Sequence, residues 1–400
     1  MRRRNILLGV GALAARDASV AAMPWLSPDL PEGTRSEAHL VQPAGKQLMI
    51  QLSDRPPNLE TPIQVFRTAI TPNDQFFVRY HLPNIPETRA FDRWQLQIGG
   101  DAAARTAGLT LRDLNDLPQT EVVAVCQCAG NGRGLVQPHV PGVQWGRGGM
   151  GCATWHGPRL RDVLARAGVK PEAVEVWFDG ADSPVLEATP PFRKSLPIAK
   201  ALAAETIVAT TMNGSPLPLL NGFPARIVVP GWTATYWMKH LTKLTISTTP
   251  LDSFWMKKAY RVPAKLFPVE TPFPTQEDAA TWPISEITVN SLIAAPVGGE
   301  QVERSGFTIR GIAWDKGDGI LRVDVSLDGG KSWQSAFLDR ELGKYAYRTW
   351  RLETGPLPRG TAELLVRATS NSKEQQPDAW RTNPAGYHNN APQRLTVTVA

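Results

Sequence analysis

Two patterns of hydrophobic and polar residues divide the chain into two parts. In the first part, from about residue 61 to 250, short hydrophobic runs predict strands, and the stretches 160–167 and 200–205 predict short helices. The predicted strands or extended segments are residues 64–67, 76–80, 109–114 (a strand that enters a short helix), 121–126, 173–178 and 225–230. Because strands and helices do not alternate regularly, the predicted class is α+β.

The second part repeats short hydrophobic runs between turn signals. Residues 321–327 alternate hydrophobic and polar positions before the turn Asp328-Gly329-Gly330. The recurring runs are residues 287–289, 306–311, 321–327, 347–352, 363–368 and 395–399. Short antiparallel strands at this spacing predict a β-sandwich over residues 286–400.

Proline-rich segments mark the predicted boundaries. Residues 23–60 are polar and proline-rich, which predicts an extended arm, and the proline-rich stretch 262–283 predicts a connector. A chain of 400 residues is long enough for two folded units. The predicted units are therefore residues 61–285 and the sandwich 286–400.

The N-terminus has the pattern of an export signal. Arg2-Arg3-Arg4 precede an apolar run over residues 6–15 and small residues up to residue 22. This order is typical of a twin-arginine signal and predicts a periplasmic protein. Removing residues 1–22 takes away four arginines and one aspartate, so the formal net charge falls from +6 to +3. That charge is too small to predict nucleic-acid binding, and no later apolar run is long enough to predict a membrane span.

The three cysteines, Cys126, Cys128 and Cys152, do not predict a disulfide scaffold, because their number is odd. No Cys-x-x-Cys-His occurs, so no covalently attached haem is expected. Residues 146–151 form a Gly-x-Gly-x-x-Gly pattern, but no helix pattern follows it. We interpret it as a flexible glycine loop and not as a dinucleotide site.

Three short segments carry candidate chemistry. Cys128 follows a predicted buried strand in a loop of small residues, and Arg133 is close enough in sequence to favour its thiolate, the form that binds a soft metal. Arg79 and His81 point the same way if the segment is extended, and such a pair can bind an anion. Residues 232–240 are aromatic and end with Lys239 and His240. Spacing alone leaves the alternatives open: buried filler cysteines, a surface Arg/His pair, and an aromatic core segment.

Together, several segments resemble the sulfite oxidase family of molybdenum enzymes. The resemblance covers about residues 60–400 and is greatest for the bacterial periplasmic sulfite dehydrogenases. The segments are residues 77–82 (FVRYHL), 128–131 (CAGN), 179–182 (DGAD), 212–218 (MNGSPLP), 221–226 (NGFPAR) with 229–231 (VPG), and 326–333 (SLDGGKSW). The resemblance implies a mixed α/β molybdopterin-binding domain followed by an immunoglobulin-like sandwich of the dimerisation type.

The resemblance also implies one molybdenum per chain, held by molybdopterin and by Cys128. In the family pattern, Arg79, Arg133, Tyr260 and Trp145 match the substrate pocket. Tyr80, His81, Asp182, Asn221, Arg226 and Lys239 match positions that hold the pterin and its phosphate. Asn221 stands where some relatives have His. Relatives often carry an arginine after a Gly-Tyr pair near the C-terminus, whereas Gly386-Tyr387 is followed here by His388-Asn389, which leaves Arg381 as the candidate substitute.

The implied activity is the oxidation of sulfite to sulfate by oxygen-atom transfer, with a separate c-type cytochrome as electron acceptor. The implied assembly is a homodimer or a heterodimer with a cytochrome subunit. The same fold also accommodates an oxidoreductase of sulfane sulfur or of a sulfoxide. A non-enzymatic periplasmic binding protein is the alternative from another class, and Cys128 beside Arg133 argues against it.

Overall fold

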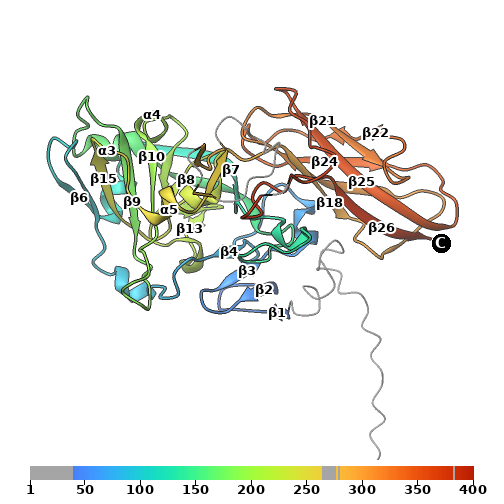
Figure 1. Ribbon diagram of the computed structural model, residues 1–400, viewed down its shortest axis with the longest axis horizontal. Coiled ribbons are helices and arrows are strands. Elements are labelled where there is room, and N and C mark those ends of the chain that lie inside the picture. Colours follow the sequence, from blue (N-terminus) through green and yellow to red (C-terminus); the bar gives the residue numbers. More distant parts are fainter. Residues whose placement is uncertain (1–38, 264–275, 278–279, 382) are drawn as a thin grey trace, which may run out of the picture.

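The computed structural model describes residues 39–263, 276–277, 280–381 and 383–400. The predicted export signal lies outside the described residues. Figure 1 shows the two parts side by side, the first at the left and the C-terminal strands at the right. Regular structure is mostly β with a few short helices, the longest of which is α3 (Leu160–Ala165), so α+β overstates the helical content.

Among the described residues, four sheets form the main body of the first part. The N-terminal sheet is antiparallel, in the order β1 (His39–Val41), β2 (Met49–Ser53), β3 (Asn58–Glu60), β4 (Val78–Arg79). A mixed sheet has the order β10 (Arg193–Pro197), β9 (Glu175–Gly180), β15 (Leu241–Ser247), β5 (Leu96–Gly99), β6 (Ala107–Leu109), and only β15 and β5 run parallel. The third has the order β13 (Ser215–Pro216), β12 (Thr211–Met212), β8 (Met150–Pro158), β7 (Gln119–Gln127), and the fourth pairs β11 (Ile207–Ala209) with β14 (Arg226–Val228).

The helices are single turns or little more. The α-helices are α2 (Leu111–Asn115), α3, α4 (Ile198–Ala201) and α5 (Phe254–Lys257), and the 3₁₀ turns are η1 (Ile63–Arg67), η2 (Thr88–Phe91), η3 (Arg133–Leu135), η4 (Leu219–Asn221) and η5 (Ala234–Tyr236). In α3, Leu160, Val163 and Leu164 recur at helical spacing and are buried. None of the described helices has both the length and the hydrophobicity that a membrane span requires.

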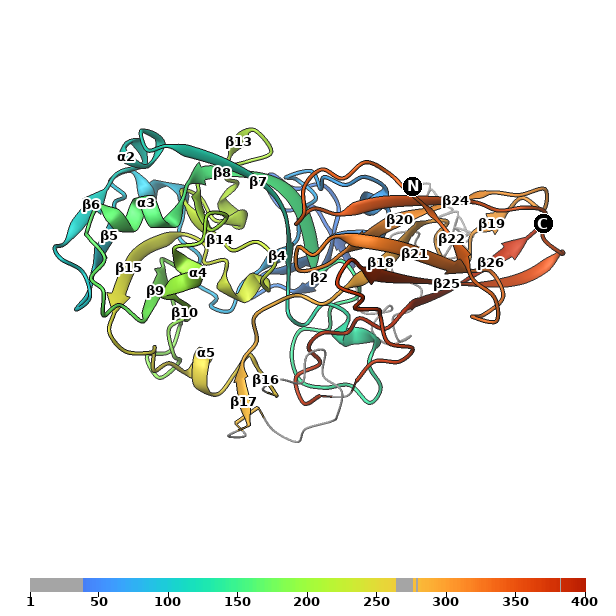
Figure 2. The same cartoon turned by 90° about the horizontal axis from the view of Figure 1, so that it is seen from above.

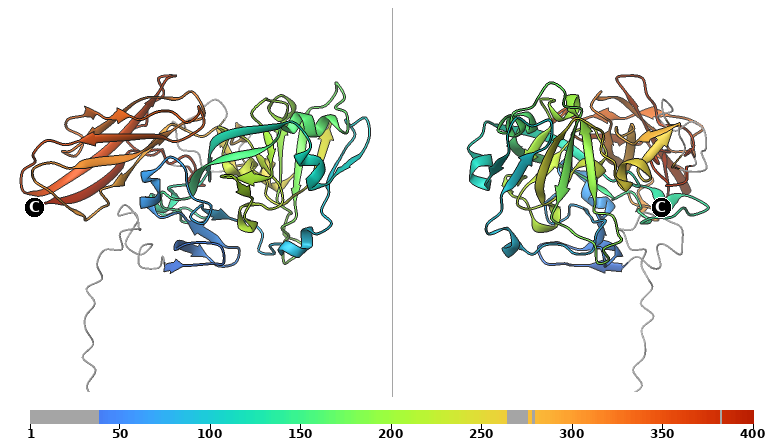
Figure 3. Two further views of the ribbon diagram at one scale, coloured as in Figure 1. Left: turned by 180° about the vertical axis from the view of Figure 1, so that it is seen from behind. Right: turned by 60° about the vertical axis from the view of Figure 1, so that its left-hand side comes forward.

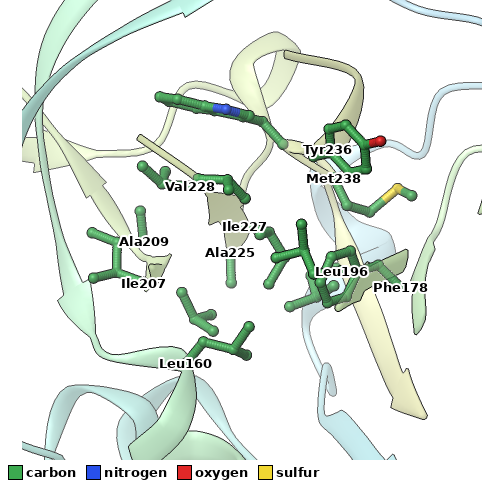
Figure 4. Close-up of a cluster of buried hydrophobic side chains, with 14 of the residues drawn as sticks. Leu160, Phe178, Leu196, Ile207, Ala209, Ala225, Ile227, Val228, Tyr236 and Met238 are labelled. Atoms are coloured by element: carbon green, nitrogen blue, oxygen red, sulfur yellow. The ribbon is translucent and has the colours of Figure 1, made fainter. Parts of the chain in front are cut away.

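Strands from three sheets pack into one hydrophobic cluster. Figure 4 shows Ile227 and Val228 of β14 between side chains of β11 on one side and Phe178 and Leu196 of the mixed sheet on the other. Leu160 closes the cluster from α3. Burying such side chains stabilises the fold by about 2 kcal/mol each. This cluster is the rigid base for the loops that follow β7, β9 and β14.

The C-terminal part consists of two sheets that share a core. One sheet has the order β18 (Asn290–Ala295), β20 (Thr308–Trp314), β24 (Arg348–Glu353), β23 (Phe337–Leu338). The other has the order β19 (Gln301–Val302), β26 (Gln393–Val399), β25 (Gly360–Ser370), β21 (Ile320–Ser326), β22 (Gln334–Ser335). Buried residues of both sheets, such as Ile309 and Val366, form one cluster. Seen from above in Figure 2, the short pair β16 (Arg261–Pro263) and β17 (Thr281–Pro283) projects beside the junction of the two parts.

The structure corrects several predicted elements. Residues 39–60 are not an extended arm, because they form β1–β3 and continue into the sheet with β4 (Figures 1 and 3). Residues 63–67 form η1 and not a strand, with Ile63 and Phe66 buried on one side. The first strand of the C-terminal part is β18, just after the predicted residues 287–289. The predicted strands 121–126, 321–327, 363–368 and 395–399 lie within or nearly within β7, β21, β25 and β26.

The predicted flexible glycine loop is instead closely packed. A Cβ on Gly148 would lie 2.0 Å from the carbonyl oxygen of Thr61, and a Cβ on Gly151 would lie 2.5 Å from the Phe76 ring. The Glu60 carboxylate accepts hydrogen bonds from the N–H groups of Gly146 and Gly148, both at 2.8 Å. Glycine is needed here because the backbones approach closely.

Candidate active site

A recess opens at the ends of β4, β7 and β14 and encloses about 630 Å³ of empty space, part of it continuous with solvent. This volume lies within the range of ~300–1,000 Å³ that is usual for small-molecule sites. Eight of the predicted site residues line it: Arg79, His81, Cys128, Asp182, Asn221, Arg226, Lys239 and Tyr260. They come from segments that are up to 181 residues apart, and the fold brings them together around one space.

Cys128 lies where β7 ends, and its loop is held by backbone hydrogen bonds. The Cys128 N–H donates to Gly149 O (2.9 Å), and its carbonyl oxygen accepts from the N–H of Asn131 (3.0 Å). Cys126, two residues earlier, also faces the recess, as expected for alternate positions of a strand. Burial raises the pKa of Cys126 to about 11, so this thiol stays protonated. Cys152 lies on β8 in a different hydrophobic cluster.

Arg79, His81 and Tyr260 form a polar group on one wall. The His81 ring nitrogen Nε2 and the Tyr260 hydroxyl share a short hydrogen bond, and the His81 ring stacks on Phe192 at 3.8 Å. Burial lowers the pKa of His81 well below its usual value, and the charges of Arg79, Lys239 and Lys194 lower it further. The imidazole is therefore neutral near pH 7.

Tyr260 has a left-handed backbone, with φ +58°. Residues other than glycine rarely adopt this conformation, and such strain often marks functional positions. The Tyr260 ring stacks on Tyr387 with centroids 5.4 Å apart, and its N–H donates to the Tyr387 hydroxyl (3.2 Å). Burial raises the pKa of Tyr260, while the charges of Arg79 and Arg133 oppose the rise.

The second wall is cationic and adjoins the first, because Lys239 Nζ donates to Arg79 O (2.5 Å). Arg226 stacks between Trp155 and Trp237, at 5.0 and 5.7 Å from the ring centroids, and its Nη1 donates to Asn221 O (2.9 Å). Lys239 Nζ lies 3.9 Å from the centroid of the Tyr80 ring. Burial lowers the pKa of Lys239 to about 7, and Asp182 opposes this shift.

Three predicted site residues lie outside the lining of the recess. The Tyr80 side chain does not line the recess, and its hydroxyl forms a hydrogen bond with His240 Nε2 (2.6 Å), so its role in cofactor binding stays a prediction. Arg133 donates to Val143 O (3.0 Å) and Ala385 O (2.7 Å). Its charge opposes the rise in the pKa of Tyr260, but its guanidinium group is hydrogen-bonded to these backbone carbonyl groups. Trp145 is fully buried against Phe77, a lining residue.

The C-terminal segment after Gly386 closes the back of this site. Asn389 Nδ2 donates to Gly132 O (2.8 Å), and Asn389 is buried, so it serves the loop that follows Cys128. Arg381 is exposed and is not among the described residues that line the recess. Where relatives often carry an arginine, this chain therefore has a neutral side chain, Asn389, that stabilises a loop.

Sequence reasoning missed several residues around the recess. Lys46 of the N-terminal sheet donates to Asn221 Oδ1 (2.8 Å). Lys194 of β10 is fully buried, with Nζ 5.4 Å from the centroid of the Tyr260 ring. Thr235 of η5 and Phe192 line the recess. Thr235 lies in the aromatic segment 232–240, and that segment was the only sequence signal for any of these four.

The unpaired polar atoms of the recess show what kind of ligand it accommodates. Arg226 Nε and Thr235 Oγ1 are buried and have no hydrogen-bond partner among the described residues. Buried donors without partners are unfavourable by about 1–3 kcal/mol each. Together with Lys239, they fit a ligand that carries an anionic group. The thiols fit a soft metal, and one of them, Cys126 Sγ, lies 3.8 Å from Arg226 Nη2.

Comparison with known proteins agrees with this chemistry. Residues 81–255 match the family model of the oxidoreductase molybdopterin binding domain, and residues 281–400 match that of the Mo-co oxidoreductase dimerisation domain. Fold and site thus define a molybdopterin-dependent oxidoreductase.

Individual relatives narrow the class to one family. The chain is 35% identical over 344 residues to sulfite oxidase of Gallus gallus, covering 82% of this chain and 72% of that protein. It is 37% identical over 366 residues to mitochondrial sulfite oxidase of Homo sapiens, covering 87% of this chain and 65% of that protein. The crystal structure of the sulfane dehydrogenase SoxCD from Paracoccus pantotrophus matches with a TM-score of 0.73 at 27% identity, over 96% of this chain and 95% of that chain. The chain belongs to the sulfite oxidase family of molybdopterin enzymes.

The cofactor is molybdopterin carrying molybdenum, and the recess fits it. Arg226, Lys239 and Thr235 would hold the phosphate and the polar edge of the pterin, because all three line the recess, and Arg226 Nε and Thr235 Oγ1 have no partner among the described residues. Cys128 would supply the protein thiolate for the metal, since a soft anionic sulfur suits molybdenum. The assignment of Cys128 and not Cys126 follows the family motif and stays a prediction.

Proposed function

We propose that this protein oxidises sulfite to sulfate. The observation that carries the proposal is the placement of Arg79 and the His81–Tyr260 pair in the same recess as Cys128. When bound, the molybdenum cofactor supplies oxygen-atom transfer and accepts two electrons. The sulfite oxidases at 35–37% identity support sulfite as the substrate.

The protein side chains bind and orient the anion. Arg79 presents a charged, planar set of donors to an oxyanion. Burial raises the pKa of Tyr260 and keeps the phenol protonated, so its hydroxyl can donate a hydrogen bond to an oxyanion. His81 is neutral near pH 7 and its Nε2 shares a hydrogen bond with the Tyr260 hydroxyl, so it orients that hydroxyl in the recess.

A second candidate is the oxidation of sulfane sulfur. The whole-chain structural match to a sulfane dehydrogenase supports it. The two candidates differ in what the recess must admit: a small free anion, or a sulfur atom attached to a larger carrier. The narrow aromatic wall of His81, Phe192 and Tyr260 favours the small anion.

We further propose that the electrons pass to a separate c-type cytochrome in the periplasm. The twin-arginine pattern of residues 1–22 supports export, and the match of residues 281–400 to a dimerisation domain supports a dimeric assembly. The proposed partner is a second copy of this chain or the cytochrome, and measuring the assembly with and without the cytochrome distinguishes the two.

The test is the reduction of cytochrome c by protein purified from molybdate-supplied cells, with sulfite and thiosulfate as parallel substrates. We expect reduction at micromolar sulfite and little with thiosulfate. Molybdenum-loaded protein that reduces cytochrome c only with thiosulfate or a persulfide carrier would support the second candidate. Size-exclusion chromatography with light scattering, with and without the cytochrome, reports the assembly.

A further inference from the structure

The N-terminal sheet contributes polar side chains to the interior of the protein. It lies outside residues 81–255, the part that matches the molybdopterin-binding model. Figure 1 shows it as the blue strands beneath the first part. Lys46, Asn58 and Glu60 come from this sheet and its loops, and their side chains are only 5%, 1% and 3% exposed. Polar side chains at this depth need partners, and those of Asn58 and Lys46 include Arg79 and Asn221, which line the recess.

Asn58 holds the substrate side. Its Oδ1 accepts from Arg79 Nη1 (3.2 Å) and from the Tyr80 N–H (3.3 Å). Its Nδ2 donates to Ser53 Oγ (2.6 Å) and Pro56 O (3.1 Å), which fixes the orientation of the amide. Asn58 is also the register partner of Arg79 between β3 and β4. Asn58 thus helps to orient the Arg79 guanidinium, whose Nη1 also donates to the Tyr80 carbonyl oxygen.

Lys46 holds the cofactor side. Its Nζ donates three hydrogen bonds, to Asn73 O (2.7 Å), Phe76 O (2.9 Å) and Asn221 Oδ1 (2.8 Å). All three ammonium donors are thereby used. With Oδ1 turned to Lys46, Asn221 directs its Nδ2 to Phe77 O (3.1 Å).

The bond between Lys46 and Asn221 reaches the cationic wall through the backbone. The carbonyl oxygen of Asn221 accepts from Arg226 Nη1 (2.9 Å), and Arg226 lines the recess with a buried Nε that has no partner in the described part of the chain. A change in the position of Asn221 therefore changes the direction of Arg226 Nε.

We propose that the N-terminal sheet positions the two halves of the site separately, Asn58 orienting Arg79 for the substrate and Lys46 orienting Asn221 and Arg226 for the anionic group of the cofactor. Neither residue touches the recess, so both are positioning residues. The Asn58 half rests on the proposed function, because it needs an anionic substrate. The Lys46 half needs only the cofactor.

The first experiment measures cofactor retention without activity. Lys46→Met, Lys46→Arg and wild type are purified with cofactor, dialysed, and assayed for bound molybdenum and for released pterin by fluorescence. Loss of charge-assisted hydrogen bonds predicts roughly tenfold faster release from Lys46→Met, with partial rescue by Lys46→Arg. Lys170→Met is the matched control, since Lys170 Nζ donates to Asp101 O (3.0 Å) in an exposed position away from the recess. If Lys46→Met does not fold, Asn221→Leu removes the same bond from the other side.

The second experiment measures substrate binding in fully loaded protein. Asn58→Leu is expected to raise the sulfite KM roughly tenfold, with kcat and molybdenum retention near wild type. The control is Gln51→Leu, which removes an exposed hydrogen bond to Asp54 on the same sheet. If wild type is inactive with sulfite, the proposed substrate fails, and weaker binding of sulfate by Asn58→Leu in calorimetry still tests the orientation of Arg79.

The pattern across the two variants decides the proposal. It is supported if Lys46→Met loses cofactor with an unchanged KM in its loaded fraction, and Asn58→Leu does the reverse. It is overturned if both variants lose cofactor and substrate affinity in parallel, since that is the result of a general loss of stability. It is also overturned if cofactor release from Lys46→Met, or from Asn221→Leu in its place, equals that of wild type.

Discussion

At the residue scale, the charge of Lys239 is linked to the binding of the cofactor. Burial lowers the pKa of Lys239 to about 7, so a part of this side chain is neutral at neutral pH in the free protein. An anionic group beside Nζ favours the charged form and raises this pKa. Binding of the cofactor phosphate and protonation of Lys239 therefore support each other, and the affinity should fall as the pH rises above 7.

Cys128→Ser is the most direct test of the metal ligand. A hydroxyl is a hard and poorly ionised ligand, so we expect the fold to persist and turnover to fall below detection. Circular dichroism checks the fold, and the visible absorption of the loaded protein reports the thiolate–metal bond. Cys152→Ser is the control, because Cys152 is buried outside the recess, and it should lower the melting temperature while activity persists. Turnover near wild type in Cys128→Ser would refute the ligand assignment.

Arg79→Gln tests the substrate wall. Removing a charged hydrogen-bond donor costs about 1.5–3 kcal/mol, or roughly 10–100-fold in KM for sulfite. We expect the molybdenum content to stay unchanged. Arg89→Gln serves as control, since its side chain is 82% exposed. An unchanged KM would remove Arg79 from the pocket.

Those residues of the candidate site that belong to a recognisable local motif could be predicted from the sequence. Cys128 in its small-residue loop and the alternation of Arg79 and His81 gave hypotheses from sequence, and the family resemblance added Asp182, Arg226 and Tyr260. Lys46 could not be found in this way, because it is an isolated lysine in a polar stretch and its partner Asn221 is 175 residues away. A hydrogen bond over that distance leaves no local pattern.

At the scale of elements, the formation of short strands depends on their partner strands as well as on their own residues. Proline content predicted an arm for residues 23–60, but the residues of β2 and β3 are buried or half-buried, and the two strands pair with each other and with β4. Proline and polarity describe a segment's own preference, whereas strand pairing depends on a partner. The strands 121–126 and 321–327 were predictable because their hydrophobic pattern is local.

Glu60 predicts a pH dependence of stability. Burial raises its pKa from 4.5 to about 7, although the N–H groups of Gly146 and Gly148 oppose this. A carboxyl whose pKa is raised on folding contributes stability below its unfolded pKa and loses it as pH rises. This group should therefore lower the free energy of unfolding by on the order of 3 kcal/mol between pH 4.5 and 7.

Glu60→Gln isolates this contribution. We expect the difference in unfolding free energy between wild type and Glu60→Gln, measured by urea denaturation, to change over this pH range. Glu87→Gln, at a side chain that is 69% exposed, should follow wild type at every pH. A difference that is constant from pH 4.5 to 7 would contradict the buried, protonated carboxyl.

At the scale of the whole molecule, the two parts share structure. Met150 and Cys152 of β8 pack in one cluster with Leu292 of β18 and Ile312 of β20. Trp314 Nε1 donates to Gln127 Oε1 (2.6 Å), and the Val125 N–H donates to Tyr345 O (2.9 Å). The strand that leads to Cys128 is thus supported from the C-terminal part.

Because of this shared cluster, we expect both parts to unfold in one transition. Ile312→Ala should destabilise the protein by about 2–5 kcal/mol and shift two signals together: near-ultraviolet circular dichroism and the visible absorption of the bound cofactor. Leu321→Ala, at a side chain that is 44% exposed, is the control. Two separate transitions, only one of them moved by Ile312→Ala, would show that the parts are independent.

The recess is enclosed by residues from both ends of the sequence, from Lys46 behind Asn221 to Tyr387 behind Tyr260. A ribosome releases these segments in order, so the enclosure does not exist until nearly the whole chain has been made. The cofactor can therefore be inserted only after synthesis, into a chain that is already close to its final shape. A transport route that threads unfolded chains would deliver an empty protein, whereas a route for folded cargo would deliver a loaded one. If the protein is exported, as the pattern of residues 1–22 predicts, the timing of cofactor loading restricts which transport route it can use.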